Sequence, residues 1–124
     1  MAYLEHANVT VTNPEHTAQR LIDLFNWNIR WSGAAMNQGH TIHVGTKDCY
    51  LALYTHKDIE EANSNSLNAG HLNHLAVVVD DIEQASNQAY RLGLEPFNFG
   101  EYQPGKRFYV MIDKDLELEV VSYN

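Results

Sequence analysis

Two stretches of the chain, residues 4–15 and 72–83, share one pattern, and this repetition limits the possible folds more than any other feature. Each begins as a β-branched run with a histidine near its start, His6 or His74, and then turns into the beginning of a helix. Superposing the two histidines, at an offset of 68 residues, also aligns further identical residues: Leu4 with Leu72, Val9 with Val77, Val11 with Val79, Glu15 with Glu83 and Leu24 with Leu92. The pattern indicates an internal duplication.

The helix beginnings carry the residue types that helix N-termini favour. Asn13-Pro14-Glu15 reads as an N-cap, a first-turn proline and a first-turn acid, and either Asp80 or Asp81 can cap the second helix. Apolar and small residues then recur at helical spacing in both halves: Ala18, Leu21, Ile22 and Phe25, and Ile82, Ala85, Ser86 and Ala89. Gly93 stands where the second helix is expected to stop.

Three further strands are expected in each half. They are residues 27–31 (ended by Ser32-Gly33), 41–44 and 49–54, and residues 94–99 (an edge strand because of Pro96), 106–112 and 116–123, with a loop at 101–105. Each half is therefore a βαβββ module, and the fold class is α+β. We expect one domain over residues 1–124, with half-modules at about 1–56 and 71–124 and a polar linker at 57–70. The helices should cover one face of a curved mixed sheet and leave a concave cleft on the other.

Composition excludes several classes of function. The formal charge is −8 with only eight Lys and Arg, which argues against a nucleic-acid partner. No apolar run approaches the ~20 residues of a membrane span. The first residues lack the pattern of a secretory signal, and a single Cys provides no disulfide framework, so a cytoplasmic location is expected.

Alternation along the expected strands assigns side chains to the cleft, because successive residues of a strand point to opposite faces. It places His6 and His74 there, with Glu117 and Glu119 of the last strand on the same side as His74. Other expected cleft residues are Asn8, Tyr50, Ala52 and Tyr54. Two imidazoles and a carboxylate are a donor set for a divalent metal with open positions.

The chain resembles the vicinal oxygen chelate superfamily, which includes glyoxalase I, fosfomycin and bleomycin resistance proteins, methylmalonyl-CoA epimerase and extradiol dioxygenases. The resemblance covers essentially the whole chain and rests on residues 4–6, 73–76 with Asp80-Asp81, and 118–121. It implies paired βαβββ modules and one divalent ion, Fe(II), Mn(II), Zn(II) or Ni(II), held by His6, His74 and Glu119. Residues 113–115 form a shorter turn than the family pattern, which leaves Glu117 as the alternative ligand.

Two positions depart from glyoxalase I. Ala52 stands where that enzyme has a further Glu ligand and the epimerase a Gln, and Thr10 stands where glyoxalase I has a glutathione-binding Arg. A three-ligand site is more similar to fosfomycin-modifying thiol transferases and extradiol dioxygenases. His43 and Tyr109 are expected to border the site, where either could orient substrate or move a proton. Arg107 shares Tyr109's face and could bind an anionic substrate group.

Two functions follow from the resemblance. The first is a metalloenzyme acting on a small oxygen-rich molecule, as a lyase or isomerase, a thiol transferase or a dioxygenase. The alternative is a metal-free protein that binds a small molecule, as bleomycin resistance proteins bind an antibiotic. The presence of all three ligand residues favours the enzyme, because sequestration does not need them. A homodimer with clefts built partly from both subunits is expected from the resemblance and from the aromatic residues Trp27, Trp31 and Tyr102.

Overall fold

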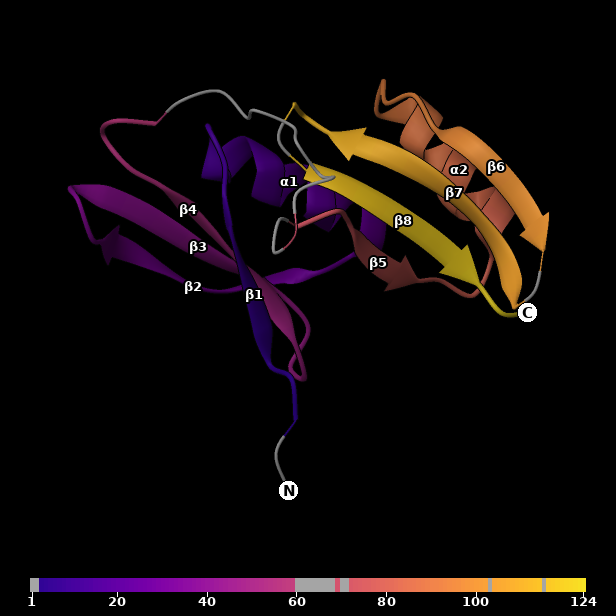
Figure 1. Cartoon of the computed structure of the whole chain (residues 1–124), viewed down its shortest axis with the longest axis horizontal. Coiled ribbons are helices and arrows are strands. Elements are labelled where there is room, and N and C mark those ends of the chain that lie inside the picture. The colour runs from indigo at the N-terminus through magenta and orange to yellow at the C-terminus, as the bar shows by residue number, and fades with distance from the viewer. Residues whose placement is uncertain (1–2, 60–68, 70–71, 103, 115) are drawn as a thin grey trace. The chain divides into compact units, whose positions relative to one another are not determined.

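The structure, a computed structural model, describes residues 3–59, 69, 72–102, 104–114 and 116–124. The chain divides into two compact units, Met1–Glu61 and Ala62–Asn124, which are described one at a time. Most of the linker predicted at 57–70 lies outside the described residues. Figure 1 shows one helix and one four-stranded sheet in each unit.

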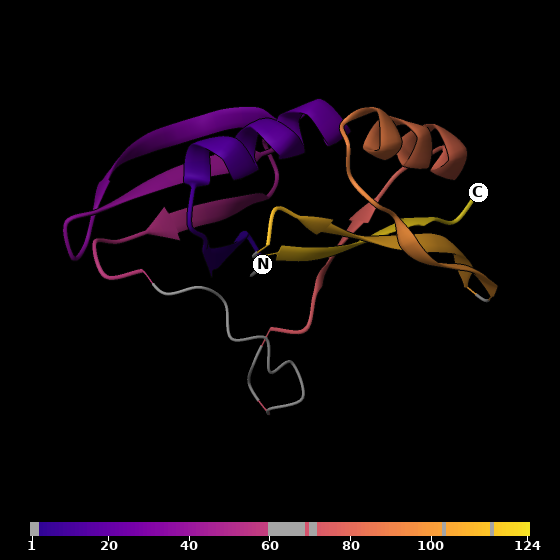
Figure 2. The same ribbon diagram turned by 90° about the horizontal axis from the view of Figure 1, so that it is seen from above.

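The first unit follows the predicted element order. It contains β1 (His6–Thr10), α1 (Pro14–Phe25), β2 (Asn28–Ala35), β3 (Gly39–Gly45) and β4 (Tyr50–Thr55). The strands lie in the order β1-β4-β3-β2, with β1 parallel to β4 and the other neighbours antiparallel. Helix α1 covers one face of this sheet (Figure 2).

The second unit repeats this arrangement. It contains β5 (Leu75–Val78), α2 (Ile82–Arg91), β6 (Phe97–Tyr102), β7 (Gly105–Ile112) and β8 (Leu116–Ser122). The strand order is β5-β8-β7-β6, again with one parallel pair, β5 and β8, and two antiparallel pairs. The predicted α+β class and the two βαβββ modules are therefore confirmed, as two four-stranded mixed sheets.

Both helices begin at the predicted caps. The side chain of Asn13 accepts a hydrogen bond from the backbone N–H of His16 at 3.1 Å, and that of Asp81 accepts one from Gln84 at 3.1 Å. Pro14 opens α1, where its missing N–H costs no helical hydrogen bond. Gly93 follows α2 with a φ of 79°, a left-handed conformation that glycine adopts without strain.

The buried sides of the strands also follow the predicted alternation. Leu118 and Val120 of β8 are fully buried with Phe108 and Val110 of β7, on the side of the sheet that α2 covers. Glu119 lies between them in sequence and therefore faces the other way. In the first unit Leu53 is fully buried, and its partner across the parallel ladder is Val9.

Strands β2 and β6 differ most from their predicted limits. Strand β2 continues past Ser32-Gly33 to Ala35, because Gly33 remains in the ladder and leaves room for the indole of Trp31: a Cβ at position 33 would lie 2.8 Å from Trp31 Cζ2. Strand β6 begins at Phe97 rather than Leu94, directly after Pro96, which has no N–H to donate. It continues through Tyr102, where a loop was predicted.

Neither of the described helices has the length and apolar character needed to cross a membrane.

Candidate metal site and substrate pocket

His74 and Glu119 lie next to each other in the second unit. His74 directly precedes β5, whose Ala76 pairs with Glu119 on the parallel neighbour β8, so both side chains lie on the face away from α2. The Nε2 atom of His74 is 3.3 Å from Oε1 of Glu119. Glu119 is 9% exposed, which is unusual for a carboxylate and requires strong partners.

Two residues of β7 supply those partners. Tyr109 is the direct cross-strand neighbour of Glu119, and its hydroxyl donates to Oε1 at 3.0 Å. Arg107 Nη1 donates to the other carboxylate oxygen, Oε2, at 3.2 Å, and both side chains of this ion pair are about nine-tenths buried. From the sequence, Tyr109 is predicted to orient substrate or move a proton, and Arg107 to bind an anionic substrate group. In the structure both hold the carboxylate of Glu119.

Both histidines of the repeat are oriented by the residue that precedes them. The Nδ1 atom of His6 lies 2.8 Å from Oε1 of Glu5, and the Nδ1 atom of His74 lies 2.7 Å from Oδ1 of Asn73. A carboxylate can only accept, so Nδ1 of His6 carries the proton, and the same tautomer fits the Asn73 oxygen. This leaves Nε2 as the atom of each ring that is able to bind a metal. Sequence reasoning missed Glu5 and Asn73, although their position next to the two histidines was visible.

Aromatic rings cross the outer face of the first sheet. The ring of His6 stacks on Tyr50 at 4.8 Å, Tyr50 stacks on His43 at 4.7 Å, and His43 lies 5.2 Å from Trp31. The guanidinium of Arg30 sits over the Tyr50 ring, 4.2 Å from its centroid. The predicted residues His6, His43 and Tyr50 are thus brought together in one unit.

Partial burial and hydrogen bonds shift three pKa values in this group. The hydrogen bond from His6 is the largest cause that lowers the pKa of Glu5. Desolvation raises the pKa of Tyr50, and the hydrogen bond that its hydroxyl donates to Glu5 at 3.2 Å acts in the same direction. Desolvation is also the main reason why the pKa of His43 is lowered. The uncharged forms of Tyr50 and His43 are therefore favoured.

The remaining predicted cleft residues lie on β1 and β4. Asn8 is exposed and pairs with Ala52, which is 2% exposed and also pairs with His43. Tyr54 donates its hydroxyl to the carbonyl of Met36 at 2.9 Å and stacks on His56. Asn8, Ala52 and Tyr54 alternate along their strands with Val9 and Leu53, and the Tyr54 hydroxyl bonds to Met36 rather than to the stacked rings of His6, Tyr50 and His43.

A pocket of about 480 Å³ adjoins His74 on the same unit. Its described lining consists of Asn73, His74, Phe97, Asn98, Phe99, Tyr109 and Glu117. Glu117 thus lines the pocket, whereas Glu119 lies in the buried network with Arg107 and Tyr109. This difference favours Glu119 over Glu117 as the predicted ligand, because a ligand carboxylate is held by outer partners.

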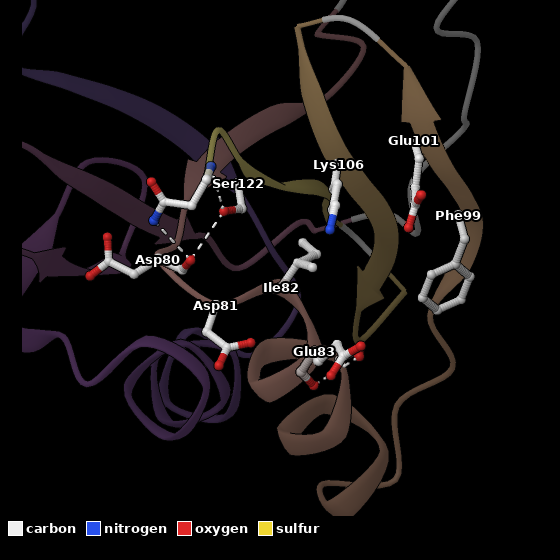
Figure 3. A pocket seen from close by; sticks show the side chains of 10 residues that line it. Asp80, Asp81, Ile82, Glu83, Phe99, Glu101, Lys106 and Ser122 are labelled. Carbon is white, nitrogen blue, oxygen red and sulfur yellow. Dashed lines mark hydrogen bonds between the residues drawn. The ribbon is translucent and has the colours of Figure 1, made fainter.

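A second pocket, of about 440 Å³, lies beside the beginning of α2 (Figure 3). Asp81, Glu83 and Glu101 line it together with Lys106. The backbone carbonyl of Asp80 at this pocket already accepts hydrogen bonds from the side chains of Ser122 and Asn124. Within either unit, the described residues contain no group of three or more His, Cys, Asp or Glu side chains that could hold a metal.

Comparison with known proteins gives a clear result only for structure. No family model matches the sequence, and no curated protein matches it. Among solved structures, a glyoxylase/bleomycin resistance protein/dioxygenase domain from Frankia sp. EAN1pec matches with a TM-score of 0.83 at 13% identity, covering 98% of both chains. A glyoxalase family protein from Enterococcus faecalis matches with a TM-score of 0.80 at 16% identity, covering 96% of both.

A fosfomycin resistance protein, FosX, from Listeria monocytogenes is also similar. Its complex with Mn(II) and sulfate has a TM-score of 0.75 at 13% identity, and the match covers 98% of this chain and 93% of that one. These identities support a shared fold and nothing finer. The resemblance found in the sequence is confirmed at that level: the chain has the fold of the glyoxalase, bleomycin resistance and dioxygenase proteins, the vicinal oxygen chelate fold.

Proposed function

We propose that the protein is a metal-dependent enzyme that acts on a small oxygen-rich molecule, with one divalent ion bound by His6, His74 and Glu119. The observation that carries the proposal is the pair of hydrogen bonds that Nδ1 of His6 donates to Glu5 and Nδ1 of His74 donates to Asn73. Metal-binding histidines characteristically donate their second ring nitrogen to a carboxylate or carbonyl oxygen, which fixes the ring and its tautomer. Both repeats have this feature at the same position.

The contact between His74 and Glu119 supports the proposal electrostatically. With the proton on Nδ1, the Nε2 atom presents a lone pair to a carboxylate oxygen 3.3 Å away. Two acceptors facing each other repel unless a positive charge lies between them, and either a proton or a metal ion supplies one. The donor set, imidazole and carboxylate, suits the transition metals named from the sequence.

The spacing of the two atoms is also compatible with an ion. Ligand atoms about 2.1 Å from one metal, at angles between octahedral and tetrahedral values, are roughly 3.0 to 3.4 Å apart. The 3.3 Å separation of Nε2 and Oε1 lies in this range. His6, from the other unit, is proposed as the third ligand because its ring is oriented in the same way.

The neighbouring residues have defined parts in this proposal. When bound, the ion would polarise substrate oxygens and stabilise negative charge that develops on them. Arg107 holds Oε2 of Glu119 and the Tyr109 hydroxyl holds Oε1, so the carboxylate keeps one orientation. The FosX structure with Mn(II) supports a metal in this fold, although the ion for the present chain is left open among Fe(II), Mn(II), Zn(II) and Ni(II).

One observation favours a second candidate, a metal-free protein that binds a small molecule. The carboxylate of Glu119 already has Arg107, Tyr109 and His74 as partners. A proton on Nε2 of His74 would complete this network without any metal. In that case the adjacent rings of His6, Tyr50, His43 and Trp31 in the first unit, and the pocket beside His74, would only bind the small molecule.

Metal analysis separates the two candidates. Protein purified without chelator or His-tag and then loaded with Mn(II) or Zn(II) should hold about one ion per chain. Glu119→Gln should lower the affinity by about tenfold or more, since the ligand loses its charge. Glu117→Gln is the matched control, two residues along the same strand, and should retain the metal. No metal in any of the three proteins would favour the binding protein, and equal metal affinity of all three would contradict Glu119 as a ligand.

A further inference from the structure

The pocket beside His74 has an aromatic wall built from two strands. The ring of Phe97 on β6 lies 6.0 Å from that of Tyr109 on β7, and the ring of His74 meets Tyr109 edge-on at 5.6 Å. The pocket volume of about 480 Å³ falls within the range of small-molecule sites. A flat ring can therefore enter beside Tyr109 without displacing the network around Glu119.

A bulge in β6 creates this wall. The pairing of β6 with β7 shifts between Phe97 and Gly100, and Asn98 has a φ of 52°. In a regular strand Phe97 and Phe99 would face the same side. Here the ring of Phe97 packs against Tyr109, whereas the ring of Phe99 packs against Phe108, which points to the opposite side of β7, so Phe99 lines only the rim of the pocket beside Asn98. The left-handed residue Asn98 thus turns the first ring into the pocket, and such strained positions cluster at functional sites.

The polar groups of the pocket are acceptors and amides. Glu117 provides a carboxylate, and Asn73 and Asn98 provide amide groups. Among the described residues that line the pocket, none is Lys or Arg. A negatively charged group placed beside Glu117 would be repelled by its carboxylate, because the positive charge of the proposed site lies on the His74 side of the pocket.

We infer that this pocket is a substrate subsite for an uncharged aromatic group that carries a hydrogen-bond donor directed at Glu117. The inference deepens the proposed function and rests on it, because the rest of the substrate would lie toward His74 and Glu119. Phe97 and Tyr109 stack with the ring, and Glu117 accepts its donor. The substrate thus differs from a compact phosphonate, which offers neither a ring nor a neutral donor.

Three probes of similar size test this inference: benzyl alcohol, cyclohexylmethanol and benzylphosphonate. They are titrated into the metal-free full-length protein, and binding is followed by NMR shifts of the amides of residues 97, 98, 109 and 117. Benzyl alcohol should bind about fivefold more tightly than cyclohexylmethanol, which lacks the π-system. It should bind about tenfold more tightly than benzylphosphonate, which is repelled by Glu117.

Variants identify the groups that are responsible. Phe97→Ala should weaken benzyl alcohol about fivefold, whereas Tyr90→Ala, at an exposed aromatic of α2, should leave binding unchanged. Glu117→Gln should reduce the preference for benzyl alcohol over benzylphosphonate to about threefold or less. Asn98→Gly should retain binding, because glycine adopts the left-handed backbone of this position without strain. Retained binding would mean that the aromatic wall depends on the bulge and not on the Asn98 amide.

Either of two results would overturn the inference. The first is equal affinity for the three probes. The second is an unchanged affinity for benzyl alcohol in Phe97→Ala that still shows the wild-type amide spectrum elsewhere. Because the titrations use metal-free protein, a failure of metal binding in the Glu119→Gln experiment leaves this test valid. Ring binding without metal binding would keep the subsite and exclude the metalloenzyme.

Discussion

His74 faces Glu119 with its Nε2 atom 3.3 Å from the carboxylate, while Nδ1 of the same ring bonds to Asn73 at 2.7 Å. One side of the imidazole is thus fixed by an amide oxygen, and the other side is directed at a nearly buried charge. The corresponding histidine of the first repeat, His6, has its Nδ1 bonded to Glu5 in the same way. The ring is therefore oriented in the same way in the two repeats, although the residue that orients it differs.

Arg107 should be essential for stability, because it neutralises a carboxylate that is 9% exposed. We expect Arg107→Leu to lower the free energy of unfolding by about 3 kcal/mol, since the buried carboxylate of Glu119 would lose its ion-pair partner. The change is measured by urea denaturation. Lys106→Leu, at the exposed neighbouring position, is the control and should cost less than about 0.5 kcal/mol. A double variant, Arg107→Leu with Glu119→Leu, should recover most of the loss, and no recovery would contradict the pairing.

Ala52→Glu tests the register of β4. Ala52 pairs with Asn8 and His43, as Glu119 pairs with Ala76 and Tyr109, so the two residues occupy equivalent places in the two modules. A carboxylate there should act as a fourth ligand and tighten metal binding by about tenfold, at a cost to stability of about 2 kcal/mol for burial. Metal titration and denaturation measure the two effects. Unchanged metal affinity would mean that residue 52 does not face the ion.

Most of the strand faces could be predicted from the sequence, and the bulges could not. Alternation placed His74 and Glu119 on one face because a β-strand has a strict period of two. It does not describe the bulge in β6, where Asn98 has a positive φ and the rings of Phe97 and Phe99 contact residues on opposite faces of β7, and no composition rule indicates this bulge. The caps at Asn13 and Asp81 were predictable, because their signals are local.

The ion pair between Arg107 and Glu119 could have been predicted from the sequence, although Arg107 was expected to bind an anionic substrate group. A turn at Asp113-Lys114 sets the register of β7 and β8, and this register places Tyr109 opposite Glu119. Arg107 precedes Tyr109 by two residues in β7, so it lies on the same face and can reach the carboxylate of Glu119. The residues missed altogether, Glu5 and Asn73, act through side-chain geometry that periodicity does not describe.

The stability of the fold should fall as pH decreases through the range where His43 protonates in the unfolded chain. Burial lowers the pKa of His43 below its ordinary value of 6.5, with smaller contributions from the charges of His6 and Arg30. Below about pH 6.5 the unfolded state therefore binds the proton more readily, and the free energy of unfolding decreases toward the folded pKa. Above this window the contribution is fully present.

His43→Phe should flatten this part of the pH profile, because it retains a ring between Tyr50 and Trp31 and removes the titrating group. Urea denaturation at intervals of half a pH unit from pH 7.5 to 5 measures the profile. This range brackets the ordinary pKa of histidine, about 6.5. His16→Gln, on the exposed side of α1, is the matched control. A wild-type slope in His43→Phe would contradict the assignment.

Mixing two inactive variants tests the predicted homodimer with shared clefts. His6→Ala and His74→Ala each remove one proposed ligand, and they lie in different units of the chain. If each cleft combines His6 of one subunit with His74 of the other, half of the randomly re-formed dimers contain one intact site, or about a quarter of all sites. Metal content after joint unfolding and refolding measures this. A metal content near zero in the refolded mixture, together with full metal content in wild-type protein after the same treatment, would contradict the shared cleft.

The central claim is that the Nδ1 hydrogen bonds reserve Nε2 of His6 and His74 for a metal ion. Side-chain ¹⁵N NMR reports it directly, because the nitrogen shifts distinguish the tautomers and respond to metal binding. In metal-free protein, Nδ1 of both rings should carry a proton, as its hydrogen bonds to Glu5 and Asn73 require. On titration with Zn(II), the Nε2 signals of both rings should shift and saturate at about one ion per chain. A proton that stays on Nε2 of His74 at saturating Zn(II), or Nε2 signals that do not move there, would contradict the account.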